Sequence, residues 1–336
     1  MRLHNTGSAN SAGLFTLSLR WVIGWTYFSA FWRRLVLENK LIPDEAGYIG
    51  EKFNHFLPNA LGIKPVIEYL VSNPDLLQIS MISFTIIEAV LGLFLILGLY
   101  TRLVSIGIIM LATGILLGSG WLGTTCLDEW QIGVLGIAGG FTLFLSGSDD
   151  FSVDNYLYHK GIFKTKMDNL CRLDSIIMPR IYNRTFILIS SIAIFSITLF
   201  TNQYFHGGVF GKLHNKSVKP KIEISNIRYH DDEVVFQLFR TEGADVYGSF
   251  LIKIEILDQY GNTVKIIDQK ELSNLPENKI RNYYIAKIKS GKHSLVLPLG
   301  AKADLSIDTH GLVIEDNYSI KLTDISGIEW QEKINI

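Results

Sequence analysis

The segment "GWLGTTCLDEWQIG", residues 120–133, places reactive side chains between two long apolar runs. It contains the thiol of Cys126 and the carboxylates of Asp128 and Glu129. A thiolate is a nucleophile, and carboxylates can move protons in a reaction. We therefore predict Cys126, Asp128 and Glu129 as catalytic residues. The alternative is an interfacial loop whose charges face water and whose cysteine is a small packed residue.

A second group of candidates lies in "LRWVIGWTYFSAFWRRL", residues 19–35. Trp21 and Trp25 belong to an aromatic stripe at helical spacing, beside a second stripe that runs from Arg20 through Gly24, Tyr27 and Phe31 to Arg34. Tryptophan is common at membrane interfaces, whereas an arginine inside a span is costly and usually faces a partner or a polar cavity. Arg20 is therefore predicted to face the interior of a helical bundle.

Two arginines, Arg33 and Arg34, end the same apolar stretch. A planar guanidinium binds an oxyanion through paired hydrogen bonds, and a nearby cation lowers the pKa of a thiol. We predict that Arg33 and Arg34 bind an anionic substrate close to Cys126.

Glu88 is an isolated carboxylate in the apolar run "SFTIIEAVLGLF". From the helical rise, Glu88 lies roughly 15 Å and Arg20 about 9 Å in from the same end of the bundle. These depths predict a buried Arg20–Glu88 pair, either as a structural clamp or as part of a proton path.

Composition indicates that a bilayer surrounds part of the chain. Of 336 residues, 48% are hydrophobic and only 19% are charged, which is more apolar material than one soluble core needs. A spanning helix needs about 20 mostly apolar residues. Five windows fit, and the first lacks the features of a cleaved signal peptide. They cover 14–37, 76–98, 102–120, 131–147 and 184–203.

Lysine and arginine counts in the loops predict the orientation. The 148–183 connection is richer in both than the 38–75 loop, which places the N-terminus in the cytoplasm and everything after 206 outside. Cys126 and Cys171 then face opposite sides of the membrane, so no disulfide joins them. We expect a four-helix membrane domain at 1–165, a connection and fifth transmembrane helix at 166–205, and an extracytoplasmic domain at 206–336.

Residues after 206 change to the pattern of strands. Short β-branched and aromatic runs are separated by Asp and Gly turns, as in tight hairpins. We predict an all-β, immunoglobulin-like sandwich after an α-helical membrane bundle, with 206–220 as a linker. The predicted strands are 234–240, 250–258, 282–289, 293–299, 318–324 and 328–334.

Several classes of function are disfavoured by the sequence. The net charge is −1 and no basic patch with interleaved aromatics is present, so we expect no nucleic-acid partner. The histidines of the tail lack tight ligand spacing, and no haem-attachment or paired C-x-x-C motif occurs. We therefore expect no bound metal or haem.

Four segments resemble the large, DoxD-type subunit of thiosulfate:quinone oxidoreductase: "RWVIGWTYFSAFWRR", "YIGEKFNHFLPNALGI", "LGLYTRL" and "CLDEWQIG". This resemblance covers roughly 1–165. The remainder resembles the small, DoxA-type subunit, so the chain looks like a fusion of the two.

The resemblance implies oxidation of thiosulfate to tetrathionate, with electrons passed to a membrane quinone and no flavin, haem or metal. We predict Trp21, Trp25, Trp130, Arg20 and Glu88 as the quinone-binding residues. Two alternatives remain open: a transporter of sulfur oxyanions, and a non-catalytic scaffold of the DoxX-like type. Self-association into a homo-oligomer is also left open.

Overall fold

The computed structural model describes residues 11–43, 45, 47–123, 128–160, 184–230, 232–244, 249–309, 311–312, 314 and 317–334. The chain divides into two compact units, each described by itself below. The helical unit comprises 1–45, 79–120 and 128–214, and the β unit comprises 46–78, 121–127 and 215–336.

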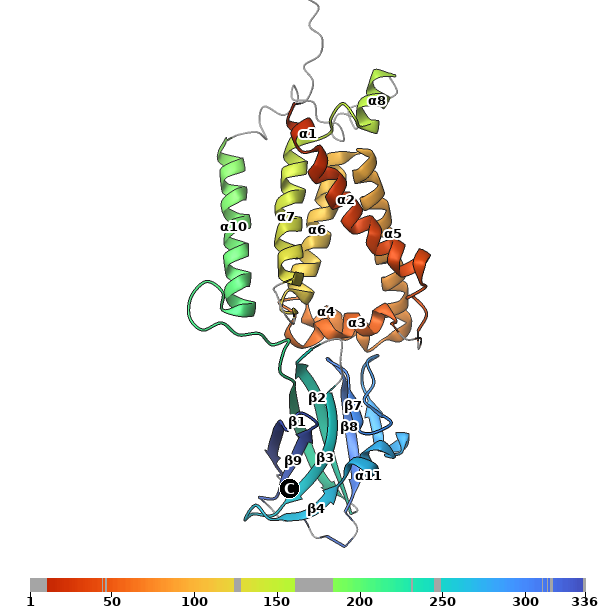
Figure 1. Ribbon diagram of the computed structural model, residues 1–336, viewed down its shortest axis with the longest axis vertical. Coiled ribbons are helices and arrows are strands. Elements are labelled where there is room, and N and C mark those ends of the chain that lie inside the picture. Colours follow the sequence, from red (N-terminus) through yellow and green to blue (C-terminus); the bar gives the residue numbers. More distant parts are fainter. Residues whose placement is uncertain are drawn as a thin grey trace, which may run out of the picture. The chain divides into compact units, whose positions relative to one another are not determined.

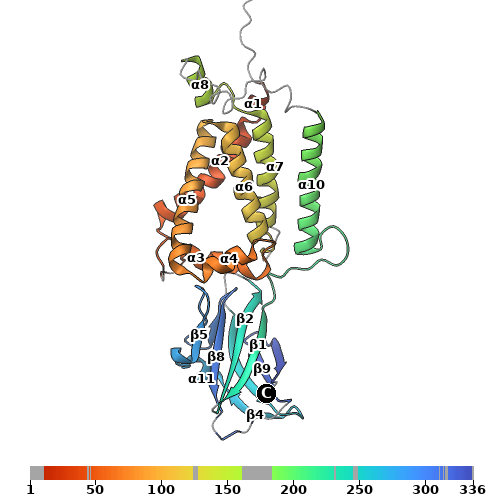
Figure 2. The ribbon, with the colours of Figure 1, turned by 180° about the vertical axis from the view of Figure 1, so that it is seen from behind.

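The helical unit is built from long apolar helices that stand side by side (Figures 1 and 2). Helix α5 begins in the β unit and contributes its residues from Ile79 onward to this bundle. The described elements are α1 (Ser11–Phe15), α2 (Leu17–Phe31), the π-helix η1 (Trp32–Leu37), α5 (Pro74–Leu97), α6 (Thr101–Ser119), α7 (Asp128–Ser146), α8 (Val153–His159) and α10 (Arg184–His206).

Three of the described helices, α5, α6 and α10, are each long and apolar enough to cross a bilayer. The other two predicted windows also form helices, α2 and α7, although α2 has only 15 residues before the π-helix. Large apolar side chains on these helices point away from the protein, such as Ile79, Met110 and Leu188, which are 60% or more exposed. Lipid is the solvent that such surfaces need, so the chain is a membrane protein.

Small residues allow α2 and α5 to pack closely. A Cβ on Gly24 would lie 2.9 Å from the carbonyl oxygen of Gly92, and a Cβ on Gly92 would lie 2.5 Å from the backbone nitrogen of Phe28. Close backbone contact through small residues is how helices associate in lipid. Gly24 also lies against Ile96 while Phe28 lies against Gly92, so the two helices run antiparallel.

Helix α10 is tied to the bundle by polar groups near one end. The indole N–H of Trp130 in α7 donates to the Thr201 hydroxyl at 3.0 Å. The His206 ring Nε2 lies 2.9 Å from the carbonyl oxygen of Gly120, which follows α6. These bonds connect a helix whose surface is otherwise largely exposed.

The described part of the β unit contains two antiparallel sheets. One has the order β1-β2-β8-β5, and the other has the order β10-β9-β3-β7-β6, with β4 paired to β3. The strands are β1 (Lys221–His230), β2 (Glu233–Glu242), β3 (Ser249–Leu257), β4 (Thr263–Ile267), β5 (Ile280–Asn282), β6 (Lys289–Ser290), β7 (Leu295–Leu297), β8 (Lys302–Asp308), β9 (Ser319–Asp324) and β10 (Glu329–Lys333).

One apolar core fills the space between the two sheets. Phe236 and Leu305 from the first sheet and Ile254 and Leu322 from the second are fully buried in it. This arrangement confirms the predicted β-sandwich. The strands predicted at 234–240, 250–258, 318–324 and 328–334 are present, and so is the irregular linker after His206.

The strand predicted at 282–289 is wrong. Strand β5 ends at Asn282, and the next six residues are irregular although their side chains alternate between buried and less buried. Their backbone bonds to other partners: the Ile285 N–H donates to the carbonyl of Val71 at 3.2 Å, and Ile288 bonds the Asn282 side chain. The alternation of residue types predicted the burial of these side chains correctly, but a β-strand also needs hydrogen bonds to a neighbouring strand.

The partner of this irregular segment comes from the 38–75 loop. This loop contains α3 (Ile49–Phe56), the 3-10 helix η2 (Leu57–Asn59) and α4 (Lys64–Val71), which belong to the β unit and lie across one end of the sandwich (Figure 2). The Asn54 side chain is fully buried and donates to the carbonyl of Gly300 at 2.7 Å. The Tyr284 hydroxyl donates to the Glu68 carboxylate at 2.6 Å.

Candidate functional site

The buried face of α2 carries the polar groups of the candidate site. Arg20, Gly24, Tyr27 and Ala30 are the buried residues of this helix, at the spacing of one helical face. Trp21 and Trp25 are 50% and 55% exposed, so they lie on the surface that faces lipid. The two stripes expected from the sequence are therefore present on one helix.

Glu88 in α5 pairs with Arg34, which follows α2 in the π-helix η1. The Arg34 Nη1 donates to the Glu88 Oε2. The Glu88 side chain is 3% exposed and the Arg34 side chain is 24% exposed, so the carboxylate is enclosed and its partner reaches it from the edge of the bundle. A charge pair at such depth is costly and usually functional in a membrane protein.

The predicted Arg20–Glu88 pair is wrong, and the packing of α2 on α5 explains why. In the antiparallel arrangement, Gly24 lies against Gly92 and Ile96, and Arg20 lies against Gly98. Residues further along α2 therefore face positions further back along α5, and Glu88 lies near the end of α2 rather than its start. Gly98 is ten residues from Glu88 along α5, or about 15 Å, whereas the estimate from helical rise placed Arg20 and Glu88 only about 6 Å apart in depth.

Tyr27 contributes a hydroxyl with no hydrogen-bond partner among the described residues, although it is buried. It interacts electrostatically with Glu88. Gly136 in α7 leaves room beside it, because a Cβ there would lie 3.1 Å from the hydroxyl oxygen. Buried hydroxyls are nearly always hydrogen-bonded. An orphan donor next to a buried carboxylate indicates a place where a polar atom of a ligand or a water can bind.

Arg20 belongs to a separate polar cluster at the other end of α2. Its Nη2 lies 3.4 Å from the Asp149 Oδ2, with both side chains 1% exposed, and donates to the Phe151 carbonyl at 3.3 Å. Burial raises the pKa of Asp149, and the Arg20 guanidinium opposes this rise. Nearby, Asp154 accepts hydrogen bonds from the backbone N–H groups of Tyr100 and Thr101 at the start of α6.

The predicted catalytic segment is only partly described. Cys126 lies outside the described residues, and so does the side chain of Asp128. Glu129 is half-buried in the first turn of α7, and the indole of Trp130 is bonded to Thr201. The convergence of Arg33 with Cys126 stays a prediction, as do the catalytic roles of this segment.

Arg33 and Arg34 differ in their surroundings despite being neighbours. Arg33 is exposed and its Nε donates to the Ser29 carbonyl at 3.3 Å, within its own helical stretch. Arg34 reaches Glu88 on another helix. Of the two predicted substrate arginines, Arg33 is therefore the exposed one.

Sequence reasoning missed the roles of Tyr27 and Asp149. Tyr27 was visible as a member of the polar stripe, but its orphan hydroxyl depends on contacts with other helices. Asp149 follows α7 in "SGSDD", where two adjacent carboxylates at the end of an apolar run were an available signal for an arginine partner.

The fold and the buried charges define a helical membrane protein that also carries a β-sandwich domain. The chain belongs to the thiosulfate:quinone oxidoreductase (TQO) family, as a DoxD–DoxA fusion: residues 15–181 match the family described as TQO small subunit DoxD, and residues 205–333 match TQO small subunit DoxA. Both descriptions say small subunit, whereas the resemblance implied a large one for the DoxD half. No solved structure matches the chain.

Proposed function

We propose that this protein oxidises thiosulfate to tetrathionate and passes the electrons to a membrane quinone. Two thiosulfate anions join through a new sulfur–sulfur bond and release two electrons. Reduction of the quinone to the quinol takes up these two electrons and two protons. Both family matches in one chain support this reaction class.

The observation that carries the proposal is the buried Arg34–Glu88 pair next to the orphan hydroxyl of Tyr27. Quinone reduction needs a hydrogen-bond donor at a carbonyl oxygen and a route for protons in a site that excludes water. The Tyr27 hydroxyl can donate that hydrogen bond, and Glu88 can pass protons to the same oxygen. Arg34 holds the Glu88 carboxylate in place and balances its charge.

This proposed quinone site keeps Glu88 and the exposed Trp21 and Trp25, which can line an entry from the lipid. It leaves out Arg20, because the Arg20 guanidinium is held by Asp149 in a different cluster. The predicted contribution of Trp130 stays open, since its indole N–H is already bonded to Thr201.

On the substrate side we propose that Cys126 and Arg33 act together. The Cys126 thiolate and one thiosulfate would form a sulfur–sulfur bond, with two electrons going to the quinone. A second thiosulfate would then attack the adduct, release the Cys126 thiolate and leave as tetrathionate. Arg33 would hold the sulfonate oxygens, and Asp128 or Glu129 would supply protons for the quinol.

The proposed topology has five spans, with the N-terminus in the cytoplasm and the β unit outside the cytoplasmic membrane. It follows from the lysine and arginine distribution in the loops. A membrane-impermeant thiol reagent added to intact cells should therefore never label Cys171. Labelling of Cys171 from outside would reverse the orientation.

The test of the reaction uses the detergent-purified protein under anaerobic conditions. Addition of thiosulfate should bleach the ultraviolet absorbance of a short-chain ubiquinone analogue, with one tetrathionate formed for each quinone reduced. If the quinone is bleached without thiosulfate, or if folded protein with thiosulfate gives no bleaching, this function is excluded. The scaffold or the transporter then remains.

A Cys126→Ser variant separates the two possible routes of sulfur chemistry. If the thiolate forms the adduct, thiosulfate-dependent quinone reduction should fall to background while the protein still folds. A variant that keeps most of its activity would mean direct transfer between thiosulfate and quinone. Cys171→Ser is the matched control and should keep full activity.

A further inference from the structure

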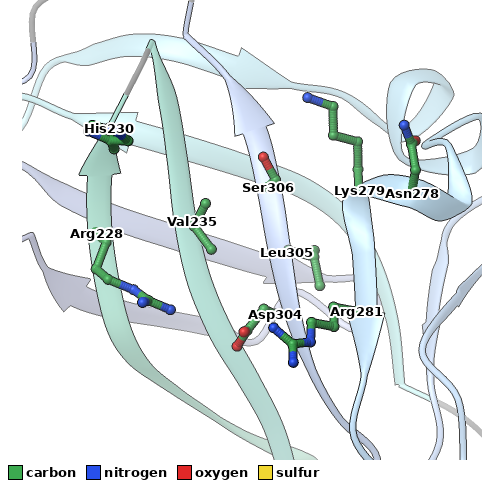
Figure 3. A pocket seen from close by; sticks show the side chains of 9 residues that line it. All are labelled: Arg228, His230, Val235, Asn278, Lys279, Arg281, Asp304, Leu305 and Ser306. Carbon is green, nitrogen blue, oxygen red and sulfur yellow. The ribbon is translucent and has the colours of Figure 1, made fainter.

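The four-stranded sheet of the β unit presents a polar groove on its outer face. Figure 3 shows Arg228 on β1 and Arg281 on β5, with Ser306 and Asp304 of β8 between them. The register explains this arrangement. Arg228 pairs with Val235, Val235 pairs with Ser306, and Arg281 pairs with Asp304, so the side chains lie in neighbouring rows on one face.

Most charges in and around this groove are already matched. Lys279 lies 2.6 Å from the Glu233 carboxylate and 2.8 Å from Asp308, so its charge is compensated. Asp304 accepts a hydrogen bond from the Tyr283 hydroxyl at 2.6 Å. The side-chain amide of Gln237 also donates to Asp304, at 3.1 Å.

The two arginines are the exception. Arg228 is exposed and has no partner in the described part of the chain. The Arg281 guanidinium lies 5.8 Å from the ring centre of Tyr283 and forms no ion pair within the described residues, although Asp304 is its cross-strand neighbour. Three strand spacings separate the two backbones, or about 14 Å, and long arginine side chains can reach inward over β2 and β8 from both sides.

We propose that this groove binds a doubly charged oxyanion of the sulfonate or sulfate type, held between Arg228 and Arg281. Guanidinium groups bind such oxygens with paired hydrogen bonds. The Ser306 hydroxyl, which lies between them, already donates to the Glu233 carboxylate, so the two arginines carry the binding. The groove has a volume of about 450 Å³, enough for an elongated dianion with a charged group at each end. That tetrathionate or thiosulfate is the ligand rests on the proposed function.

The experiment measures anion binding to the full-length protein in detergent at fixed ionic strength. Sodium tetrathionate, thiosulfate, sulfate and phosphate are titrated separately by calorimetry. Hydrogen exchange followed by mass spectrometry locates the binding. We expect protection of the peptides that contain β1 and η3–β5 (η3, Glu277–Lys279), with the tightest binding for an anion that has two sulfonate ends.

The variants Arg228→Gln and Arg281→Gln should each weaken this binding by about tenfold, and the double variant should abolish the protection. Lys333→Gln, which removes one positive charge from the exposed face of β10 in the other sheet, is the matched control and should bind normally. Equal affinity in the double variant and the wild type, or no protection of β1 and β5 by any of the four anions, overturns the proposal.

Thiosulfate-dependent quinone reduction is measured on the same preparations. If the protein reduces quinone but no anion protects β1 and β5 from hydrogen exchange, the groove is rejected and the proposed function stands. If an anion protects β1 and β5 but the protein does not reduce quinone, the proposed function is rejected and the groove remains an oxyanion site.

Discussion

The described part of the helical unit has two ion pairs with an almost fully buried carboxylate, whereas most described ion pairs of the β unit are exposed; Glu255, 7% exposed beside Lys321, is an exception there. In the helical unit, Arg20 and Asp149 are both 1% exposed, and Glu88 is 3% exposed beside Arg34. In the β unit, Lys279 and its partner Glu233 are 21% and 35% exposed. Exposed pairs contribute little to stability because water screens them. Removing charges from water is costly, so the buried pairs of the helical unit need another reason to be present.

That reason differs between the two buried clusters. Arg20, Asp149 and Asp154 lie where α2, α6 and α7 begin or end, and their bonds go largely to backbone groups that need partners. Glu88 lies within the apolar length of α5, with Arg34 and the unpartnered Tyr27 hydroxyl beside it. The first cluster connects helix ends, and the second is the one that we propose for quinone chemistry.

The largest effect is expected for Glu88→Gln. Loss of a proton-transferring carboxylate lowers turnover by about 10² or more, and quinone reduction should fall accordingly. The substitution also leaves Arg34 without its partner, which typically costs about 3 to 5 kcal/mol for a buried pair. Stopped-flow measurement of quinone bleaching gives the turnover.

The double variant Glu88→Gln/Arg34→Gln separates these two consequences. It removes both charges, so the midpoint of thermal unfolding should recover toward that of the wild type while turnover stays low. Recovery of turnover together with stability would show that the pair is a structural clamp, in contrast to its proposed role.

A smaller effect is expected for Tyr27→Phe. The ring still fills its place between the helices, but the hydrogen bond to the quinone is lost. The KM for quinone should therefore rise about tenfold, the equivalent of one neutral hydrogen bond. The KM for thiosulfate should not change. Tyr204→Phe, on the exposed surface of α10, is the matched control. A normal quinone KM in Tyr27→Phe would remove Tyr27 from the site.

In the β unit, a buried carboxylate should affect stability rather than activity. Burial of Asp324 opposes its ionisation, but hydrogen bonds from Ser249, Ser326 and Phe250 outweigh burial and hold the pKa of Asp324 below its ordinary value. A lowered folded-state pKa stabilises the fold above the ordinary pKa of about 3.9, and this contribution is lost as pH falls from there through the lower value.

Asp324→Asn should therefore lower the unfolding free energy of the β unit by about 1 to 3 kcal/mol at neutral pH, and less at pH 3. Chemical denaturation followed by circular dichroism at both pH values measures this. Asp268→Asn is the control, because Asn caps the short helix α11 (Gln269–Ser273) about as well as Asp does. A pH-independent loss in Asp324→Asn would contradict the assigned role of the charge.

The smallest effect is expected for Lys279→Gln. Its two carboxylate partners are exposed enough for water to replace the ion pairs, so the unfolding midpoint should not change measurably. A loss comparable to that of Asp324→Asn would show that surface pairs of the β unit resemble the buried pairs of the helical unit, and the contrast between the units would fail.

The sequence by itself determined the long helices and half of the ten described strands, namely β2, β3, β7, β9 and β10. Apolar length identified α5, α6 and α10, and the spacing of Arg20, Gly24 and Tyr27 identified the buried face of α2. These features are local, because a helix or a half-buried strand repeats its pattern within a few residues. Strand β1 was missed because polar residues interrupt it and β4 because it is short, whereas β8 alternates regularly over seven residues and could have been recognised.

Only the tertiary structure decided which charged groups meet. Glu88 pairs with Arg34 and not with Arg20 because the antiparallel packing of α2 on α5, set by Gly24 and Gly92, fixes which turns face each other. The segment after Asn282 is irregular because its backbone bonds to Val71 from a distant loop. Arg228 and Arg281 line one groove because strand register places them there. Each outcome depends on contacts between residues far apart in the chain, which no local pattern encodes.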